Sequence, residues 1–372
     1  MEGEVERRII IIFEDEQGCG KMRVLITGGA GFVGSHAAEY YANKECEVIV
    51  FDNLSRVNLL KGFNEEIAYY NWNYLRKFDN VELVKGDIRE KKEIENACKE
   101  VDAIIHAAAQ VAVTTSLVDP KTDFDINCLG TFNVLEAARK SKNDPAFLYC
   151  STNKVYGDNV NKIPVKELEK RYIFSDKNFN EGIPEDFPID LAEHTPYGCS
   201  KLAADLYVQD YGKTYGLKTC VFRMSCIYGD RQFGTEDQGW VAHFAISTLL
   251  KKPLTIYGDG KQVRDILFID DLIDAFDAFI EKKRFNGSVY NIGGGKDNTI
   301  SLLELLDLLE EQTGLRSDLN FENWREGDQK VYISDITRIK KELNWEPKID
   351  VEKGLKRLID WVLKNKNYLL KT

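Results

Sequence analysis

Residues 22–52 read MRVLITGGAGFVGSHAAEYYANKECEVIVFD, and this stretch decides the fold. The apolar run Met22–Thr27 has the composition of a buried strand, and Glu47–Phe51 repeats that pattern. Between them lie a glycine-rich turn, Gly28–Gly34, and a segment, Ser35–Asn43, whose composition predicts a helix. A strand, a glycine-rich turn, a helix and a second strand within about thirty residues are typical of a dinucleotide-binding βαβ unit.

Each part of this pattern has a chemical purpose. Gly28 permits a tight turn, Gly31 lets backbone N–H groups approach a pyrophosphate, and Gly34 lets the helix pack closely on the strand. Asp52 follows the second strand, where its carboxylate can accept hydrogen bonds from both hydroxyls of an adenosine ribose. Its charge would repel a 2′-phosphate, which favours NAD over NADP, although Arg56 nearby weakens that preference slightly.

The alternation of strands and helices continues along the chain. Val81–Val84 predicts a third strand, Ala103–His106 a fourth and Phe147–Ser151 a fifth, and Phe124–Ala138 predicts an amphipathic helix. The economical arrangement is an α/β fold with a Rossmann-type, doubly wound parallel sheet. Asp87 after the third strand would meet the adenine, and the small residues after the fourth would allow a nicotinamide ribose to lie against the backbone.

A tyrosine and a lysine share one helix face in the segment Tyr197-Gly-Cys-Ser-Lys201. A lysine ammonium close to a phenol favours the phenolate, so we expect Lys201 to lower the pKa of Tyr197 from its usual value of about 10. Tyr197 would then be a base that removes a proton from a sugar hydroxyl, and Thr152 would hydrogen-bond the same hydroxyl. A solvated Tyr and Lys is the usual alternative, but the position after a dinucleotide fold and a Ser-Thr strand end favours catalysis.

These features together resemble a known family. The T-G-x-x-G-x-x-G turn, the H-A-A-A loop at 106–109 and the Y-x-x-x-K pair resemble the extended short-chain dehydrogenase/reductases, specifically the NAD-dependent sugar-nucleotide epimerases and dehydratases. The resemblance covers roughly residues 22–365. It implies that Thr152 orients the reacting hydroxyl, that Tyr197 is the base and Lys201 its partner, and that Asn127 holds the lysine through a water. The NAD contacts expected on all these grounds are Gly28, Gly31, Phe32, Val33, Gly34, Asp52, Asn53, Asp87, Ile88, Ala107, Ala109, Asn127, Tyr197 and Lys201.

Three further segments, STNKVYGD at 151–158, DQGWV at 237–241 and GKQVRD at 260–265, resemble the 2-epimerase branch of this family. Members of that branch invert C2 of a nucleotide-bound hexose through a transient 2-keto sugar, as in the conversion of CDP-paratose to CDP-tyvelose, and regenerate NAD in each cycle. The 4,6-dehydratases place Asp-Glu where this chain has Asn153-Lys154, and galactose 4-epimerases carry an Asn where it reads Met224-Ser225-Cys226. A 4-epimerase or 4,6-dehydratase on the same scaffold is the alternative, and a non-catalytic NAD-binding protein is a more distant one.

The family pattern also implies a set of substrate contacts. Arg264 and Arg325 would clamp the diphosphate with bidentate, charge-assisted hydrogen bonds, the alternative being surface ion pairs. Trp240 would stack on a base or sugar, unless it is a core residue at a helix start. The full set of expected substrate contacts is Gln110, Thr152, Asn153, Ser225, Gln238, Trp240, Gln262, Arg264 and Arg325.

The chain divides into an N-terminal extension and two lobes. Residues 1–21 are the extension, and a NAD-binding lobe spans 22–223 with about 263–292. A smaller sugar-nucleotide-binding lobe comprises about 224–262 with 293–372. The long charged stretch 158–193 would be a lid over the sugar pocket or a surface ornament. The resemblance implies a homodimer or higher homo-oligomer through helices near 127–140 and 197–215.

Composition excludes several other classes of protein. The formal net charge is −11, which argues against a general affinity for nucleic acid or an anionic membrane. No apolar run approaches the ~18–20 residues of a membrane span, and we expect a cytoplasmic protein. The 8 cysteines form no C-x-x-C pair and the 4 histidines show no metal spacing, so we expect buried free thiols and no metal site.

Overall fold

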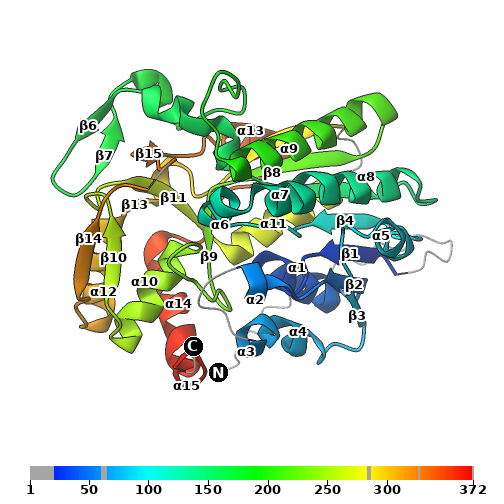
Figure 1. Cartoon of the computed structure of the whole chain (residues 1–372), viewed down its shortest axis with the longest axis horizontal. Coiled ribbons are helices and arrows are strands. Elements are labelled where there is room, and N and C mark those ends of the chain that lie inside the picture. The colour runs from blue at the N-terminus through cyan, green and yellow to red at the C-terminus, as the bar shows by residue number, and fades with distance from the viewer. Residues whose placement is uncertain (1–20, 60–64, 283–285, 326, 371–372) are drawn as a thin grey trace, which may run out of the picture.

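A seven-stranded sheet forms the centre of the larger lobe in the computed structural model, which describes residues 21–59, 65–282, 286–325 and 327–370 (Figure 1). Its strand order is β12-β8-β5-β4-β1-β2-β3, and every neighbouring pair is parallel. This confirms the expected α/β fold with a doubly wound sheet. The strands are β1 (Arg23–Thr27), β2 (Glu47–Asp52), β3 (Val81–Lys85), β4 (Ala103–His106), β5 (Ala146–Thr152), β8 (Thr219–Met224) and β12 (Ser288–Ile292).

Helices cover both faces of this sheet because its strands are apolar on both sides. Along β1, Val24 and Ile26 belong to one buried cluster and Leu25 to another. The first cluster includes residues of α1 (Phe32–Asn43) and α11 (Ile269–Ile280), and the second includes residues of α5, α8 and α9. The other helices of this lobe are α2 (Arg56–Leu59), α3 (Glu65–Ala68), α4 (Tyr70–Leu75), α5 (Lys91–Ala97), α6 (Val113–Val118), α7 (Pro120–Phe124), α8 (Thr131–Arg139) and α9 (Pro196–Tyr215).

The helix expected over 124–138 is continuous but irregular. α7 ends at Phe124, a π-helical turn η1 spans Asp125–Gly130, and α8 continues from Thr131. Such turns insert an extra residue into the helical repeat and are frequent at functional sites. Asn127, which was expected to support the catalytic lysine, lies within this turn.

A second lobe is built on smaller sheets. β11 (Val263–Phe268) pairs with β9 (Cys226–Tyr228), β13 (Thr299–Ser301) and β15 (Val331–Tyr332). The expected segment 263–292 therefore divides, because β12 joins the main sheet whereas β11 lies in this second one. The remaining elements around these sheets are β10 (Leu254–Tyr257), β14 (Leu319–Glu322), α10 (Trp240–Leu250), η4 (Lys296–Asn298), α12 (Leu302–Thr313), α14 (Val351–Lys364) and α15 (Lys366–Leu369). The helix α13 (Thr337–Leu343) instead packs against β12 of the main sheet and against α11.

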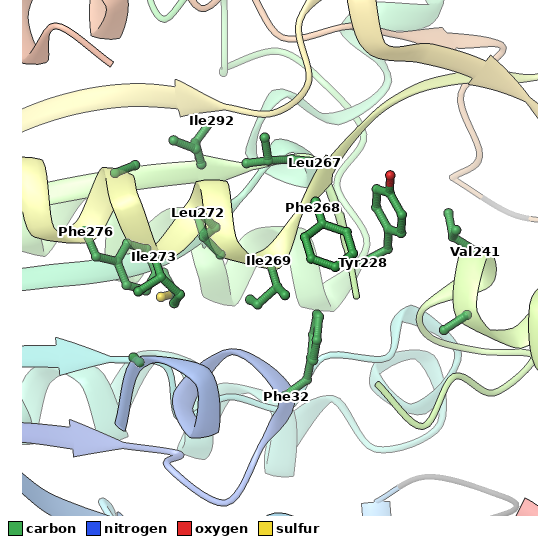
Figure 2. Packing of buried hydrophobic residues seen from close by; sticks show 14 of the residues in the cluster. Phe32, Tyr228, Val241, Leu267, Phe268, Ile269, Leu272, Ile273, Phe276 and Ile292 are labelled. Atoms are coloured by element: carbon green, nitrogen blue, oxygen red, sulfur yellow. The ribbon is translucent and has the colours of Figure 1, made fainter. Parts of the chain in front are cut away.

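One hydrophobic core joins the two lobes (Figure 2). Phe32, the first residue of α1, points toward Phe268 and Ile269, where β11 passes into α11. Tyr228 of β9 and Val241 of α10 belong to the same cluster. This packing fixes the glycine-rich turn, which directly precedes Phe32, relative to the second lobe.

The stretch 158–193 is packed against the rest of the molecule. It contains the end of the 3-10 segment η2 (Asn153–Lys162), the antiparallel strands β6 (Val165–Glu167) and β7 (Tyr172–Phe174), and the turn η3 (Lys177–Phe179). Ile183 is fully buried, and its carbonyl accepts a 2.7 Å hydrogen bond from the Asn291 side chain on β12. The segment is thus part of the wall between the lobes.

Several single features complete the description of the fold. Leu305 and Leu309 of α12 are fully buried, so this leucine-rich helix contributes to the core. The cysteines of the described ranges are free thiols, as expected, and they are buried except for Cys226, which is half-buried, and Cys199, which is exposed. Within those ranges no helix is long and apolar enough to cross a membrane. No group of three or more His, Cys, Asp or Glu side chains in the described residues could hold a metal ion. The extension at 1–20 lies outside the described residues.

Candidate active site

The glycine-rich turn at the start of α1 leaves no room for side chains at two positions. Gly28 has a φ of +69°, and a Cβ there would lie 2.6 Å from the backbone nitrogen of Ala108. A Cβ at Gly34 would lie 2.3 Å from the carbonyl oxygen of Gly28. Gly31 is the N-cap residue of α1. The turn therefore presents bare backbone at a helix N-terminus, which suits an anionic phosphate group.

A cavity of about 300 Å³ extends from this turn along the carboxyl ends of the strands. We call it the first cavity. Its lining includes every expected NAD contact except Asn127, and it includes four of the expected substrate contacts. Its lining includes Gly28, Gly31, Phe32, Val33, Gly34, Asp52, Asn53, Asp87, Ile88, Ala107, Ala109, Gln110, Thr152, Tyr197, Lys201, Ser225 and Gln238.

Two carboxylates mark one end of the first cavity. The Asp52 carboxylate accepts hydrogen bonds from the backbone N–H groups of Ala30 (3.0 Å) and Leu54 (2.8 Å), which fix its orientation. Burial raises the pKa of Asp87, but hydrogen bonds from Arg89 and Asn53 outweigh it and bring the pKa to about 2. Asp87 is therefore ionised at neutral pH. Its carboxylate accepts a 2.9 Å hydrogen bond from the side-chain amide of Asn53.

Thr152, Tyr197 and Lys201 meet at the other end. Lys201 is buried on α9, and its Nζ donates a 2.7 Å hydrogen bond to the carbonyl of Cys150 on β5. Thr152 ends the same strand, and its side chain lies close enough to Tyr197 to lower the pKa of the phenol. The phenol and the hydroxyl are therefore placed to bind one substrate hydroxyl between them.

We expected a lowered pKa for Tyr197, and this prediction is wrong for the protein without a bound ligand. Burial raises this pKa to about 12, and the nearby Thr152 side chain only partly offsets that effect. Burial likewise lowers the pKa of Lys201 to about 8. Both groups are held in a desolvated site that disfavours charge, and this effect exceeds the mutual attraction argued from their spacing.

Asn127 lies behind the first cavity. Its amide bonds both ways with the backbone of Gln110, accepting from the N–H at 2.9 Å and donating to the carbonyl at 3.0 Å. It also donates to Asp123 at 3.1 Å and to the Ser200 hydroxyl at 3.2 Å. In this structure Asn127 therefore fixes the loop after β4 and contacts α9 next to Lys201.

The remaining expected substrate contacts are dispersed. Ser225 and Gln238 line the first cavity, where Gln238 accepts a 2.9 Å hydrogen bond from Arg56. Trp240 lines neither of the two cavities, and its indole N–H donates a 3.3 Å hydrogen bond to the Cys226 sulfur. This position agrees with the alternative that Trp240 is a core residue at a helix start. Gln262 is buried and donates to the Tyr257 carbonyl at 2.7 Å. Asn153, also buried, is placed next to Thr152 but outside the cavity lining.

The two expected diphosphate arginines are both paired with carboxylates. Arg264 is buried, lines neither cavity and forms an ion pair of 2.5 Å with Asp328. Arg325 forms ion pairs with Glu236 at 3.3 Å and Asp237 at 3.7 Å. Neither guanidinium was expected to have these partners.

Arg325 and Asp328 line a second cavity of about 780 Å³. Its walls come from the 158–165 segment, from 193–196 just before Tyr197, and from 324–331 apart from residue 326. It therefore lies between the packed insertion and the second lobe, close to the chain that leads into α9.

Other residues of the first cavity were not predicted. Met224 and Ile227 lie in β8 and β9 and the others in turns or loops, so these residues approach the site only through the fold. Apart from Ala30, which lies in the glycine-rich turn, no local motif marks them. The clearest cases are Ala30, Leu54, Ser55, Gly86, Met224, Ile227 and Gln232. Arg56, weighed above for its charge, also lines the cavity, which its position four residues after Asp52 could have indicated.

The residues of the first cavity fit NAD. The bare backbone at Gly28–Gly34 suits the pyrophosphate, and the fixed carboxylate of Asp52 suits a ribose with two free hydroxyls. The small side chains of Ala107 and Ala109 lead from there to Tyr197, where a nicotinamide ring would lie beside the substrate.

Comparison with known proteins agrees with this site. Residues 24–293 match the NAD dependent epimerase/dehydratase family. The chain is 43% identical over 350 residues to the CDP-paratose 2-epimerase of Salmonella typhi, which covers 91% of this chain and 99% of that protein.

Two solved structures have the same architecture. The UDP-glucose 4-epimerase of Thermotoga maritima with UDP-glucose has a TM-score of 0.76 and 30% identity, covering 93% of this chain and 100% of that one. The UDP-glucuronic acid 4-epimerase of Bacillus cereus, in complex with UDP-glucuronic acid and NAD, has a TM-score of 0.75 and 27% identity, covering 92% and 99%.

The matched region contains the glycine-rich turn, the carboxylates at the strand ends and the Thr-Tyr-Lys group, so sequence likeness and site geometry concern the same residues. The chain belongs to the NAD-dependent epimerase/dehydratase family, the extended short-chain dehydrogenase/reductases that act on sugar nucleotides.

Proposed function

We propose that this NAD-dependent epimerase inverts C2 of a nucleotide-diphosphate hexose, in a reaction of the CDP-paratose to CDP-tyvelose type. The observation that carries the proposal is the pair Asn153-Lys154, which directly follows Thr152 at the catalytic end of the first cavity. A 4,6-dehydratase needs an acid and a base there to eliminate water, and an amide with an ammonium group supplies no such carboxylate pair. The 43% identity to a protein named CDP-paratose 2-epimerase supports the same choice.

The chain's own residues account for proton transfer at the substrate. Thr152 and Tyr197 bind the hydroxyl of the reacting carbon. Tyr197 must first lose its own proton, and its phenolate oxygen then takes the substrate's proton during oxidation. Lys201 holds a positive charge near that oxygen and is anchored on the Cys150 carbonyl. The NAD that the residues of the first cavity would hold would supply the hydride acceptor for the oxidation at C2 and the hydride for the later reduction. Tyr197 then gives the proton back, so the enzyme is unchanged after each cycle.

Inversion requires the keto sugar to turn within the site. We propose that the diphosphate is held firmly by Arg325 and Arg264 while the sugar ring is held loosely. The diphosphate would then compete with Asp328 for Arg264, and with Glu236 and Asp237 for Arg325. Ser225, Gln238 and Gln110 line the first cavity around the place where the sugar would turn.

The direct test is to incubate the purified enzyme with CDP-, GDP- and UDP-hexoses and to identify the inverted carbon by NMR. Inversion at C2 is expected. Inversion at C4, or loss of water to a 4-keto-6-deoxy sugar, would contradict the proposal and return the enzyme to the 4-epimerases or dehydratases. The solved 4-epimerases with TM-scores of 0.76 and 0.75 show that this scaffold also accommodates C4 chemistry.

We also propose that two copies of the chain associate through η1, α8 and α9. Large apolar side chains are exposed there, including Leu129 (42%), Phe132 (36%), Leu206 (47%) and Tyr207 (45%). The rings of Phe132 and Tyr207 lie 5.7 Å apart, which joins α8 and α9 into one continuous apolar surface. A homodimer would cover it. Leu206→Glu should convert the dimer to a monomer in light scattering, whereas an unchanged mass would exclude this surface. A cytoplasmic location stays a prediction.

A further inference from the structure

Lys154 lines neither cavity but is hydrogen-bonded to one lining residue of each. Its backbone N–H donates a 3.2 Å hydrogen bond to the Thr152 hydroxyl, and Thr152 lines the first cavity. Its side-chain Nζ donates a 3.1 Å hydrogen bond to the carbonyl of Gly327, which lines the second cavity. The Lys154 side chain therefore spans from the catalytic strand end to the loop that carries Arg325 and Asp328.

The cations around this junction differ in how they are compensated. Arg264 is paired with Asp328, and Arg325 is paired with Glu236 and Asp237. Lys154 forms no ion pair with any residue in the described ranges, and the partner of its ammonium group is the neutral carbonyl of Gly327. Among these three cations Lys154 thus carries the charge without a directly bound carboxylate.

Lys154 is half-buried, and a partly desolvated ammonium group is costly unless an anion or several dipoles compensate it. Burial lowers the pKa of Lys154, and Arg264 lowers it further while Asp328 raises it. This side chain is therefore poorly explained as a structural salt bridge. Its position suits a group that meets a negative charge supplied by the ligand.

The proposed substrate supplies that charge at the right place. In the proposed reaction its sugar lies against Thr152 and Tyr197, which line the first cavity, and we place its nucleotide toward Arg325, which lines the second. The diphosphate joins these two parts, so it must cross the junction. We infer that Lys154 binds the diphosphate of the substrate there and is a third cationic ligand beside the two arginines. The inference rests on the proposed function only for the substrate class, a sugar linked to a nucleoside diphosphate.

The test compares a nucleoside diphosphate with its monophosphate. Calorimetric titration of the NAD-containing enzyme with CDP and CMP measures the contribution of the second phosphate group. We expect Lys154→Met to weaken CDP binding by about tenfold or more, because a charge-assisted contact is lost, and to change CMP binding by less than about threefold. Lys154→Arg should recover part of the CDP affinity. Lys166→Met, an exposed lysine on β6 of the adjoining insertion, is the matched control and should match the wild type for both ligands.

Several results would overturn the inference. Equal weakening of CDP and CMP by Lys154→Met would place the lysine at the base or ribose, or give it a structural role only. Unchanged affinity for both would remove it from the binding site. If Lys154→Met loses its NAD or its cooperative unfolding, Lys154→Gln and Lys154→Arg replace it, and equal CDP affinity in these two would also contradict the inference.

The wild type provides a reading that is independent of the reaction. If the wild type binds UDP, GDP or dTDP more tightly than CDP, the titrations use that diphosphate and its monophosphate in place of CDP and CMP. No preference for any diphosphate over its monophosphate would exclude a diphosphate subsite. Because binding of these nucleotides involves no chemistry at the sugar, a failure of C2 inversion would overturn the proposed function and leave this result interpretable.

Discussion

The Lys201 ammonium group and the Cys150 carbonyl are joined by a 2.7 Å hydrogen bond. Cys150 lies two residues before Thr152 on β5, and Lys201 lies one helical turn after Tyr197 on α9. This one contact therefore fixes the helix that carries the base against the strand that carries the hydroxyl. Its acceptor belongs to the backbone of a central strand, so the geometry depends little on the neighbouring side chains.

The pH dependence of turnover should reveal this lysine. Burial lowers the pKa of Lys201 to about 8, so its positive charge is lost as the pH rises through that value. Because the charge favours the Tyr197 phenolate, we expect kcat/KM to decline on the alkaline side near pH 8. Lys201→Arg, whose guanidinium stays charged, should be slower but should lack this decline. The same alkaline decline in both enzymes would contradict the assignment.

Unfolding does not explain such a decline. The pKa of Lys201 is lower in the folded chain than its usual value of about 10.4, so between these two values the unfolded chain binds more protons. The contribution of Lys201 to the free energy of unfolding therefore increases with pH in this window. Thermal unfolding measured at each pH value provides the check.

Removal of the two hydroxyls that bind the reacting group should abolish most turnover. Tyr197→Phe and Thr152→Val keep the apolar volume in buried positions, so both variants should fold and retain NAD. General acid–base catalysis supplies ~10²–10⁴-fold, and we expect losses of that order in kcat. Tyr215→Phe, at the exposed end of the same helix, is the control and should be active. A nearly full rate for Tyr197→Phe would mean that another group is the base.

The glycine-rich turn should tolerate no Cβ at Gly28. Gly28→Ala combines a φ of +69° with a contact of 2.6 Å to the Ala108 backbone, so we expect loss of bound NAD and a lower free energy of unfolding. Gly216→Ala is the matched control because its φ is +73° but nothing lies within 4 Å of the new Cβ. It should cost only the backbone strain, about 1 kcal/mol, and keep its NAD. Equal effects of the two substitutions would show that close approach to the loop after β4 is unimportant.

The cofactor released on denaturation should be NAD. The Asp52 carboxylate, oriented by the N–H groups of Ala30 and Leu54, is placed to bind ribose hydroxyls and to repel a 2′-phosphate. Asp52→Asn keeps the shape but removes the charge, so it should reduce the preference for NAD over NADP. Chromatography of the released nucleotide measures both results. Stoichiometric NADP in the wild type would contradict the role of Asp52.

The sequence alone was sufficient for the parts of the site that depend on local pattern. The turn at Gly28 could be predicted because only glycine combines a positive φ with close backbone approach, and the spacing of Tyr197 and Lys201 because a helix repeats every 3.6 residues. The parallel sheet followed from the alternation of apolar runs with helical segments.

Partners distant in the sequence could not be predicted in the same way. Arg264 pairs with Asp328, 64 residues later, and no local pattern indicates this partner. The pKa of Tyr197 was expected to fall, but desolvation, which depends on the whole surrounding fold, raises it to about 12. Trp240 was undecided between stacking and core because the position of the Cys226 sulfur is set by the second sheet.

The central claim is that chemistry occurs at C2, because one base, Tyr197, serves only the carbinol that the pocket holds against it. The most direct measurement uses substrate deuterated either at C2 or at C4. We predict a primary isotope effect from C2 with the label retained at C2 of the product, and the unlabelled rate from the substrate deuterated at C4. A primary isotope effect from C4 with none from C2 would contradict the account.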